Sequence, residues 1–157
     1  SLILSPKGHV EHALHVVDDG ESVWLGVEPG TSAAVVEWLD RMRFMLRVEA
    51  ADVSGHYATL GETRAAEGLP GEPTAWVDPW PGPVGDTALY AQADPHPGAQ
   101  RPWREVFVPR AELEQAIGDR PPAGTWAAEA LRVHAWRPRL LAETDHRTIA
   151  HEADWLR

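Results

Sequence analysis

Two histidines stand out among the side chains that could do chemistry in this sequence, His12 and His134. Histidine titrates near neutral pH, so it can move a proton, contact a ligand or hold a metal. His12 falls on the apolar face of a predicted strand with Val10, and His134 shares a predicted helix face with Leu131. A histidine in either place can also be an ordinary packed residue, so a site role and a core role both stay open.

Two charged residues are further candidates, Glu28 and Arg132. Glu28 precedes Pro29-Gly30, where an acid can be an exposed turn residue or a ligand contact. Arg132 lies three residues after Glu129, and this spacing forms ion pairs on a helix. Arg132 can therefore be a binding residue or only half of such a pair.

A metal centre is the less favoured alternative. His9, His12 and His15 recur every three residues, but on a strand His12 points away from the other two. The acids and histidines between positions 145 and 152 lack a tight motif such as H-E-x-x-H. The chain has no cysteine, which removes thiolate ligands and a cysteine nucleophile. The sequence also has no phosphate-binding glycine loop and no Ser-His-Asp arrangement.

Tryptophan is unusually abundant, with eight residues against two Phe and two Tyr. Four lie on predicted strands or helices and are expected in the core: Trp24, Trp38, Trp126 and Trp136. Three lie beside proline-rich turns: Trp76, Trp80 and Trp103. These three can pack the loops, which is the favoured interpretation, or form an aromatic wall for a flat ligand.

Composition excludes several classes of protein. The 157 residues suit one domain, and 43% hydrophobic with 24% charged residues is ordinary for a globular chain. No apolar run approaches the ~20 residues of a membrane-spanning helix. The net charge of −10 offers no basic stripe for phosphates, so we expect no direct nucleic-acid binding. The absence of cysteine fits a cytoplasmic protein, and the opening at Ser1, without a methionine, suggests a piece of a longer chain.

The hydrophobic pattern of the first part predicts a hairpin followed by a helix. A strand is expected over 10–16, a turn at Asp18–Glu21 and a returning strand over 22–27. Thr31 or Ser32 can cap the helix. Its apolar positions follow helical spacing: Val35, Trp38, Leu39 and Met42.

Short strands and two helices are predicted for the remainder. The strands are expected at Phe44–Val48, His56–Leu60, Thr74–Val77, Ala88–Ala91 and Glu105–Val108, with turns at 68–73, 79–83 and 94–98. One helix starts near Pro109, buries Leu113 and Ile117 and stops at Gly118; the other starts at Thr125 and runs through Trp136 to end before Pro138. This order predicts an α+β fold with antiparallel sheets and packed helices, including a ferredoxin-like element.

Three stretches resemble one known family. Residues 4–10, 18–20 and 24–30 resemble the hairpin of the YgfZ and aminomethyltransferase (GcvT-like) superfamily. Arg132-Val133-His134-Ala135 resembles that family's Arg-x-Glu-Ala-Gly helix, and Glu143–Trp155 resembles the stretch just before its Lys-Gly-Cys-Tyr-x-Gly-Gln-Glu signature. The resemblance implies that residues 1–157 are the central part of a folate-binding domain, without its N-terminal segment and C-terminal barrel.

The resemblance also implies a function. YgfZ-type proteins bind tetrahydrofolate and support the assembly or repair of iron–sulfur proteins, so folate and iron–sulfur proteins are the expected partners. By the same resemblance, the residues that would contact folate are His12, Glu28, Arg132 and His134.

Three of these positions depart from the related enzymes. The catalytic Asp of the aminomethyltransferases corresponds to His12-Ala13, an Asn corresponds to Glu28, and the helix Glu corresponds to His134, while Arg132 is kept. Without a fixed carboxylate near the pterin nitrogen, a developing iminium is not stabilised. We therefore expect folate binding without aminomethyl transfer. The alternatives are an aminomethyltransferase-type enzyme and an interaction module that has lost folate.

Overall fold

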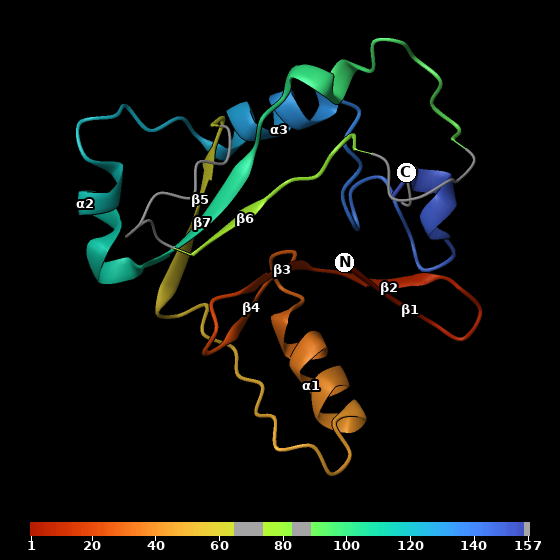
Figure 1. Ribbon diagram of the computed structural model, residues 1–157, viewed down its shortest axis with the longest axis vertical. Helices are drawn as coiled ribbons and strands as arrows, with labels where there is room; N and C mark the ends of the chain where they lie inside the picture. The colour runs from red at the N-terminus through yellow and green to blue at the C-terminus, as the bar shows by residue number, and fades with distance from the viewer. Residues whose placement is uncertain (65–73, 83–88, 156–157) are drawn as a thin grey trace.

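The computed structural model describes residues 1–64, 74–82 and 89–155. These residues form an α+β arrangement of small antiparallel sheets and helices, as the sequence predicts (Figure 1). The strands are β1 Leu2–Leu4, β2 Val10–Ala13, β3 His15–Asp18, β4 Val23–Gly26, β5 Tyr57–Glu62, β6 Ala75–Val77 and β7 Arg104–Pro109. The α-helices are α1 Ser32–Met42, α2 Leu113–Ile117 and α3 Thr125–His134, with 3-10 turns at Pro97–Gln100, Arg110–Glu112 and Ala150–Ala153.

The strand predicted over 10–16 is interrupted at Leu14. β2 pairs with β1, whereas β3 pairs with β4 in a separate sheet. Leu14 is buried between them, and its backbone exchanges two hydrogen bonds of 2.8 Å with Ser1. The predicted turn between β3 and β4 is confirmed, with Gly20 at φ 90° and the Asp19 carboxylate accepting from the Ser22 N–H at 2.7 Å.

The largest sheet has the order β5-β7-β6 and is antiparallel throughout. β7 is central, and Val106, Phe107 and Val108 are buried along it. The strands predicted around residues 56–60, 74–77 and 105–108 are therefore confirmed, with shifts of a few residues at their ends.

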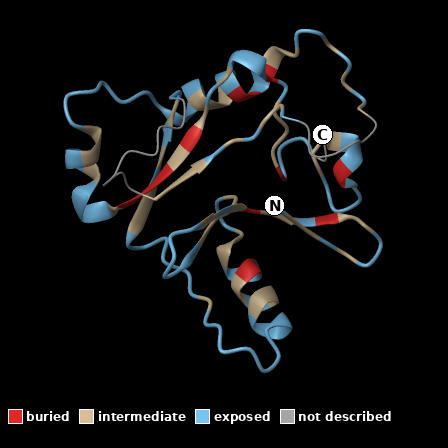
Figure 2. Cartoon of the chain, in the orientation of Figure 1, coloured by how far each residue is buried: buried red, intermediate tan, exposed pale blue. Residues whose placement is uncertain are grey.

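A second buried cluster joins the two ends of the described chain (Figure 2). Val10, Leu140 and Ala150 pack together there. The Val10 N–H donates to the Thr148 carbonyl at 2.9 Å, and His9 forms an isolated bridge with Ile149. The C-terminal segment thereby lies against β2.

The three helices form where the hydrophobic spacing predicts them. α1 buries Val35, and α2 ends at Gly118, whose φ of 58° an L-residue rarely adopts. The expected side-chain caps are absent: Thr31 donates instead to the Glu28 carbonyl at 2.8 Å, and Gly124, which has no side chain, is the N-cap of α3. The helix starts therefore depend on their surroundings more than on the cap residues.

Two predicted strands do not form in the described residues. Residues 44–48 are a turn followed by irregular chain, because no described strand lies beside them to complete a ladder. Residues 89–91 are not a strand either, and Ala88 lies outside the described residues. The turn predicted at 68–73 and the last residue of the 79–83 turn also lie outside them; within 79–82, the Gly82 N–H donates to the Pro79 carbonyl.

The expectation of four core tryptophans is wrong for two of them. Trp126 is 87% exposed and Trp136 is 52% exposed, whereas Trp24 and Trp38 are half-buried. Trp126 stands in the first turn of α3, a helix whose buried residue is Arg132. An apolar side chain on a helix is buried only if a neighbouring element covers its face.

Candidate functional site

A large cleft lies where the N-terminal strands, the β5-β7-β6 sheet and α3 meet. Its volume is about 1290 Å³, which is ample for a cofactor-sized ligand. Six arginines line it: Arg64, Arg101, Arg120, Arg132, Arg137 and Arg139. Six carboxylates line it as well: Glu28, Glu62, Asp78, Glu105, Glu129 and Asp154. The two sets are equal in number, so the lining side chains carry no formal net charge, whereas the whole chain has a net charge of −10.

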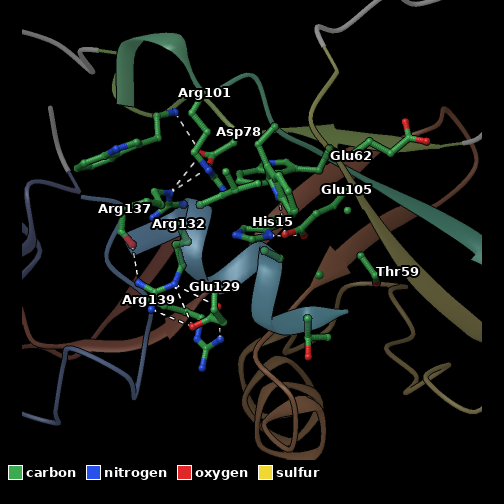
Figure 3. A pocket seen from close by; sticks show the side chains of 18 of the residues that line it. His15, Thr59, Glu62, Asp78, Arg101, Glu105, Glu129, Arg132, Arg137 and Arg139 are labelled. Atoms are coloured by element: carbon green, nitrogen blue, oxygen red, sulfur yellow. Dashed lines mark hydrogen bonds and ion pairs between the residues drawn. The ribbon is translucent and has the colours of Figure 1, made fainter. Parts of the chain in front are cut away.

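A stacked pair of rings forms one wall of the cleft (Figure 3). His15 of β3 lies on Trp76 of β6, with ring centroids 3.6 Å apart and planes within 1°. The His15 Nδ1 atom is 2.6 Å from Oε2 of Glu105, which stands opposite Trp76 in the register of β7 and β6. This contact joins the β3–β4 hairpin to the larger sheet.

Trp103 extends the aromatic wall toward β5. Its indole Nε1 donates to Oε1 of Glu105 at 3.4 Å, and the Arg101 guanidinium lies 4.7 Å from its ring centroid. The ring packs directly against Gly61, where any side chain would collide with it. Trp76, Trp80 and Trp103 all line the cleft, so the aromatic-wall interpretation gains support beside the packing one.

Replacing Gly61 by alanine tests the packing of this wall. We expect Gly61→Ala to lower the free energy of unfolding by about 1–3 kcal/mol, because the new Cβ forces the Trp103 indole to move. Urea denaturation measures the loss, and near-ultraviolet circular dichroism reports the displaced indole. Gly55→Ala is the matched control, since a Cβ there meets nothing within 4 Å. Equal losses in the two variants would contradict the packing shown here.

Asp78 holds two arginines at the same end of the cleft. Its side chain is 3% exposed and lies 3.0 Å from Nη1 of Arg101 and 3.1 Å from Nε of Arg137. Burial lowers the pKa of Arg101, and the neighbouring Asp78 carboxylate opposes that shift. Arg137 also lies over Trp80, at 5.6 Å from the ring centroid. The Asp78 carboxylate neutralises only one of the two guanidiniums. The three side chains Asp78, Arg101 and Arg137 together therefore carry one positive charge.

A second charged network connects α3 to the N-terminal half. Arg132 pairs with Glu129 at 3.0 Å and with Glu143 at 2.9 Å. Arg139 pairs with Glu129 at 2.7 Å and approaches Glu28 at 3.4 Å. Hydrogen bonds from Arg132 lower the pKa of Glu129, whereas burial raises the pKa of Glu28 against the opposing effect of Arg139.

The structure places the four predicted site residues in two groups. Glu28 and Arg132 line the cleft and are linked through Arg139 and Glu129. His12 lies on β2 opposite Ile3, and His134 is exposed at the end of α3; the residues described as lining the cleft include neither. Arg132 also forms the ion pair with Glu129 that was its alternative role. It therefore lines the cleft and is ion-paired at the same time.

Several lining residues were not among the sequence-based candidates. His15 appeared only in the less favoured metal triad, and its partner Glu105 is 90 residues away in the chain. Asp78 and the pair Arg137 and Arg139 carried no motif, apart from the clustering of two arginines around Pro138 just after a predicted helix. Only tertiary contacts identify these residues.

Two features are absent from the described part of the chain. In residues 1–64, 74–82 and 89–155, no three side chains of the His, Cys, Asp or Glu type are grouped so that they could hold a metal ion. Within the same ranges, none of the helices has the length and apolarity needed to cross a membrane.

Comparisons with known proteins do not identify the chain. No protein-family model matches it, and neither a curated protein nor a solved structure is significantly similar to it.

Proposed function

We propose that this chain is the central part of a YgfZ-type folate-binding protein and that its cleft holds tetrahydrofolate. In this proposal the α+β elements belong to the ferredoxin-like, folate-binding domain of the aminomethyltransferase superfamily. The observation that carries the proposal is a single cleft that combines a flat aromatic wall, a half-buried carboxylate and, at the Asp78 end, two guanidinium groups that share one carboxylate. A reduced folate has a flat ring with hydrogen-bond donors at one edge and a tail of carboxylates. In the proposal, the aromatic wall contacts the ring, the half-buried carboxylate accepts from the donor edge, and the guanidinium groups bind the tail.

The aromatic wall suits the flat part of the ligand. Stacking on Trp76 and Trp103 would remove apolar ring surface from water at about 25 cal/mol per Å² of apolar area. Aromatic contacts with offset geometry add to that burial. His15 covers one face of Trp76, and Trp103 is contacted by the Arg101 guanidinium and by Gly61, so the ligand ring would stack on a remaining face of one of these indoles.

Glu28 is our candidate for the donor edge of the pterin ring. Its side chain is 17% exposed, and its nearest cation, Arg139, is 3.4 Å away and also paired with Glu129. A carboxylate that is only loosely paired can accept hydrogen bonds from the amino group and ring N–H of the ligand. The raised pKa of Glu28 has burial as its main cause, and a ligand that donates to the carboxylate would oppose that shift.

The arginines at the Asp78 end suit the carboxylate tail. Arg101 and Arg137 share one carboxylate, so one positive charge there is not balanced by Asp78. Guanidinium groups bind carboxylates through paired hydrogen bonds. A tail that reaches this end of the cleft would complete that charge balance.

The cleft also supports binding without aminomethyl transfer. Ala13, one of the two positions that correspond to the catalytic Asp, lines the cleft and presents a methyl group. A methyl group cannot stabilise a developing iminium. We therefore propose a non-catalytic role in the assembly or repair of iron–sulfur proteins, with aminomethyl transfer as the alternative.

Titration with tetrahydrofolate tests the proposal. We expect saturable quenching of tryptophan fluorescence, because Trp76 and Trp103 line the cleft. Glu28→Gln should weaken binding by about ten- to a hundredfold, since a hydrogen bond to a charged group contributes about 1.5–3 kcal/mol. Glu21→Gln, at an exposed turn residue, should leave the affinity unchanged. A titration without any saturable change would rule out folate as the ligand of this chain.

The iron–sulfur role needs a separate measurement. In cells that lack the native protein, we expect the intact protein to restore the activity of iron–sulfur enzymes, and its Glu28→Gln form to restore less. If both forms restored the enzyme activity equally, the iron–sulfur role would not depend on ligand binding in the cleft.

A further inference from the structure

The imidazole of His15 is held in one orientation within the cleft. Its ring lies flat on Trp76, with the ring centroids 3.6 Å apart, and its Nδ1 atom is 2.6 Å from Oε2 of Glu105. The backbone of Gly26 passes beside it, so that a Cβ added to this glycine would lie 3.2 Å from the Cβ of His15. Contacts with three different strands therefore fix where the remaining edge of the ring points.

The remaining edge of the ring carries the Nε2 atom. Within residues 1–64, 74–82 and 89–155 this atom has no hydrogen-bond partner, and it is not one of the buried side-chain nitrogens that lack one. The His15 side chain is 28% exposed and lines the cleft. Figure 3 shows one edge of the ring directed at Glu105 and the other edge turned away from it. Nε2 is therefore open to a ligand in the cleft.

The contact with Glu105 also sets the tautomer of the neutral imidazole. An ionised carboxylate can only accept, so the Nδ1–H of His15 donates to Oε2 of Glu105. The second carboxylate oxygen accepts from the Trp103 indole at 3.4 Å, which helps to hold Glu105 in place. In a neutral ring with its proton on Nδ1, Nε2 carries a lone pair and accepts a hydrogen bond.

Glu28 provides another acceptor in the same cleft. Burial raises the pKa of Glu28, and the positive charges of Arg139 and His15 oppose that shift, so His15 is close enough to act on this carboxylate. The donor edge of the proposed ligand carries an amino group beside a ring N–H. Two acceptors in one cleft can serve these two donors, whereas Glu28 alone leaves part of the edge to water.

We propose that His15 is a second ligand-binding residue of the cleft, whose neutral Nε2 accepts a hydrogen bond from the donor edge of the ligand. Glu105 is its positioning residue. This inference rests on the proposed function and names the acceptor that acts beside Glu28. The charged groups around the imidazole are Glu105 and Glu28, with Arg132 and Arg137 on the side opposite Glu105 in the view of Figure 3. Protonation of Nε2 removes its lone pair, so binding weakens as the pH falls through the range in which histidine titrates.

Nitrogen NMR of the whole chain with 15N-labelled histidine tests the state of the ring. At pH 8 we expect long-range proton–nitrogen correlations of His15 to show a protonated Nδ1 and a bare Nε2. The Nε2 signal should move when tetrahydrofolate saturates the protein. A protonated Nε2 at pH 8, or an Nε2 signal that the bound ligand leaves in place, would overturn the inference.

Two asparagine variants test what Nε2 contributes to affinity. In His15→Asn the amide N–H stands where Nδ1 stands and can still donate to Glu105, whereas Nε2 is gone. At pH 8 this variant should bind tetrahydrofolate about tenfold more weakly than the unaltered chain, the effect of one lost hydrogen bond. Between pH 8 and pH 6 the unaltered chain should lose about tenfold in affinity by the same reasoning, and His15→Asn should lose much less. His56→Asn, at an exposed histidine that is not among the residues lining the cleft, should behave like the unaltered chain.

The outcomes separate this inference from the function on which it rests. Failure of the unaltered chain to bind tetrahydrofolate at either pH would overturn both. Equal affinity of His15→Asn and the unaltered chain, or a pH dependence that the variant retains, would overturn the role of His15 and leave folate binding intact. Circular dichroism checks the fold of each variant. The loss of the His15 signals in His15→Asn assigns them, and His15→Gln replaces that variant in both measurements if it does not fold.

Discussion

Asp78→Ala is expected to destabilise the protein by about 3–5 kcal/mol, the cost of removing one partner from a buried ion pair. The Asp78 side chain is 3% exposed, and its removal leaves Arg101 and Arg137 facing each other, with 10% and 17% of their side chains exposed. The repulsion between the two guanidiniums and the loss of their hydrogen bonds to Asp78 both lower the free energy of unfolding. Urea denaturation followed by circular dichroism measures the change in the free energy of unfolding.

Asp119→Ala serves as the control for this variant. Asp119 is exposed, so its loss should change the free energy of unfolding by less than about 0.5 kcal/mol. Asp78→Ala should also weaken tetrahydrofolate binding, because it releases the two arginines from their positions. A variant as stable as the control would mean that Asp78 does not hold the two arginines together.

Leu140→Ala is expected to lower the free energy of unfolding by about 2–5 kcal/mol. Leu140 is 4% exposed and packs with Val10 and Ala150, so the truncated side chain leaves a cavity between the N-terminal strands and the C-terminal segment. The effect should appear as a lower urea midpoint with an unchanged slope.

The next residue provides the control for this cluster. Leu141 is 66% exposed, and Leu141→Ala removes the same atoms from a side chain that is mostly in water. We expect Leu141→Ala to lower the free energy of unfolding by well below about 1 kcal/mol. Similar losses for the two variants would contradict the burial of Leu140 against β2.

Local patterns in the sequence were enough to predict most elements. The helical spacing around Val35 predicted α1, and the apolar runs around Leu60 and Val106 predicted β5 and β7. Gly118 marked the end of α2 because a positive φ suits glycine. These features depend on a residue and its near neighbours in the chain, so the sequence alone is enough to predict them.

The tertiary structure decided which patterns became paired or buried. The segment around Leu46 has the alternation of a strand and remains unpaired, and Trp126 has helical spacing and remains exposed. Strand pairing and burial each need a second element at the right distance, and the sequence pattern does not say whether one is there.

The candidate site shows the same division. Of the four residues predicted from the sequence, Glu28 and Arg132 line the cleft, whereas His12 and His134 are not among its lining residues. The structure added His15 with Glu105 and the group around Asp78. Composition showed an acidic, cysteine-free chain, and the order of the predicted strands and helices indicated an α+β fold. Only the tertiary structure determined the cleft, because it is built from contacts between residues that are distant in the sequence, such as His15 and Glu105. The energy of such a contact depends on the distance between the groups and on their burial, and not on their order along the chain.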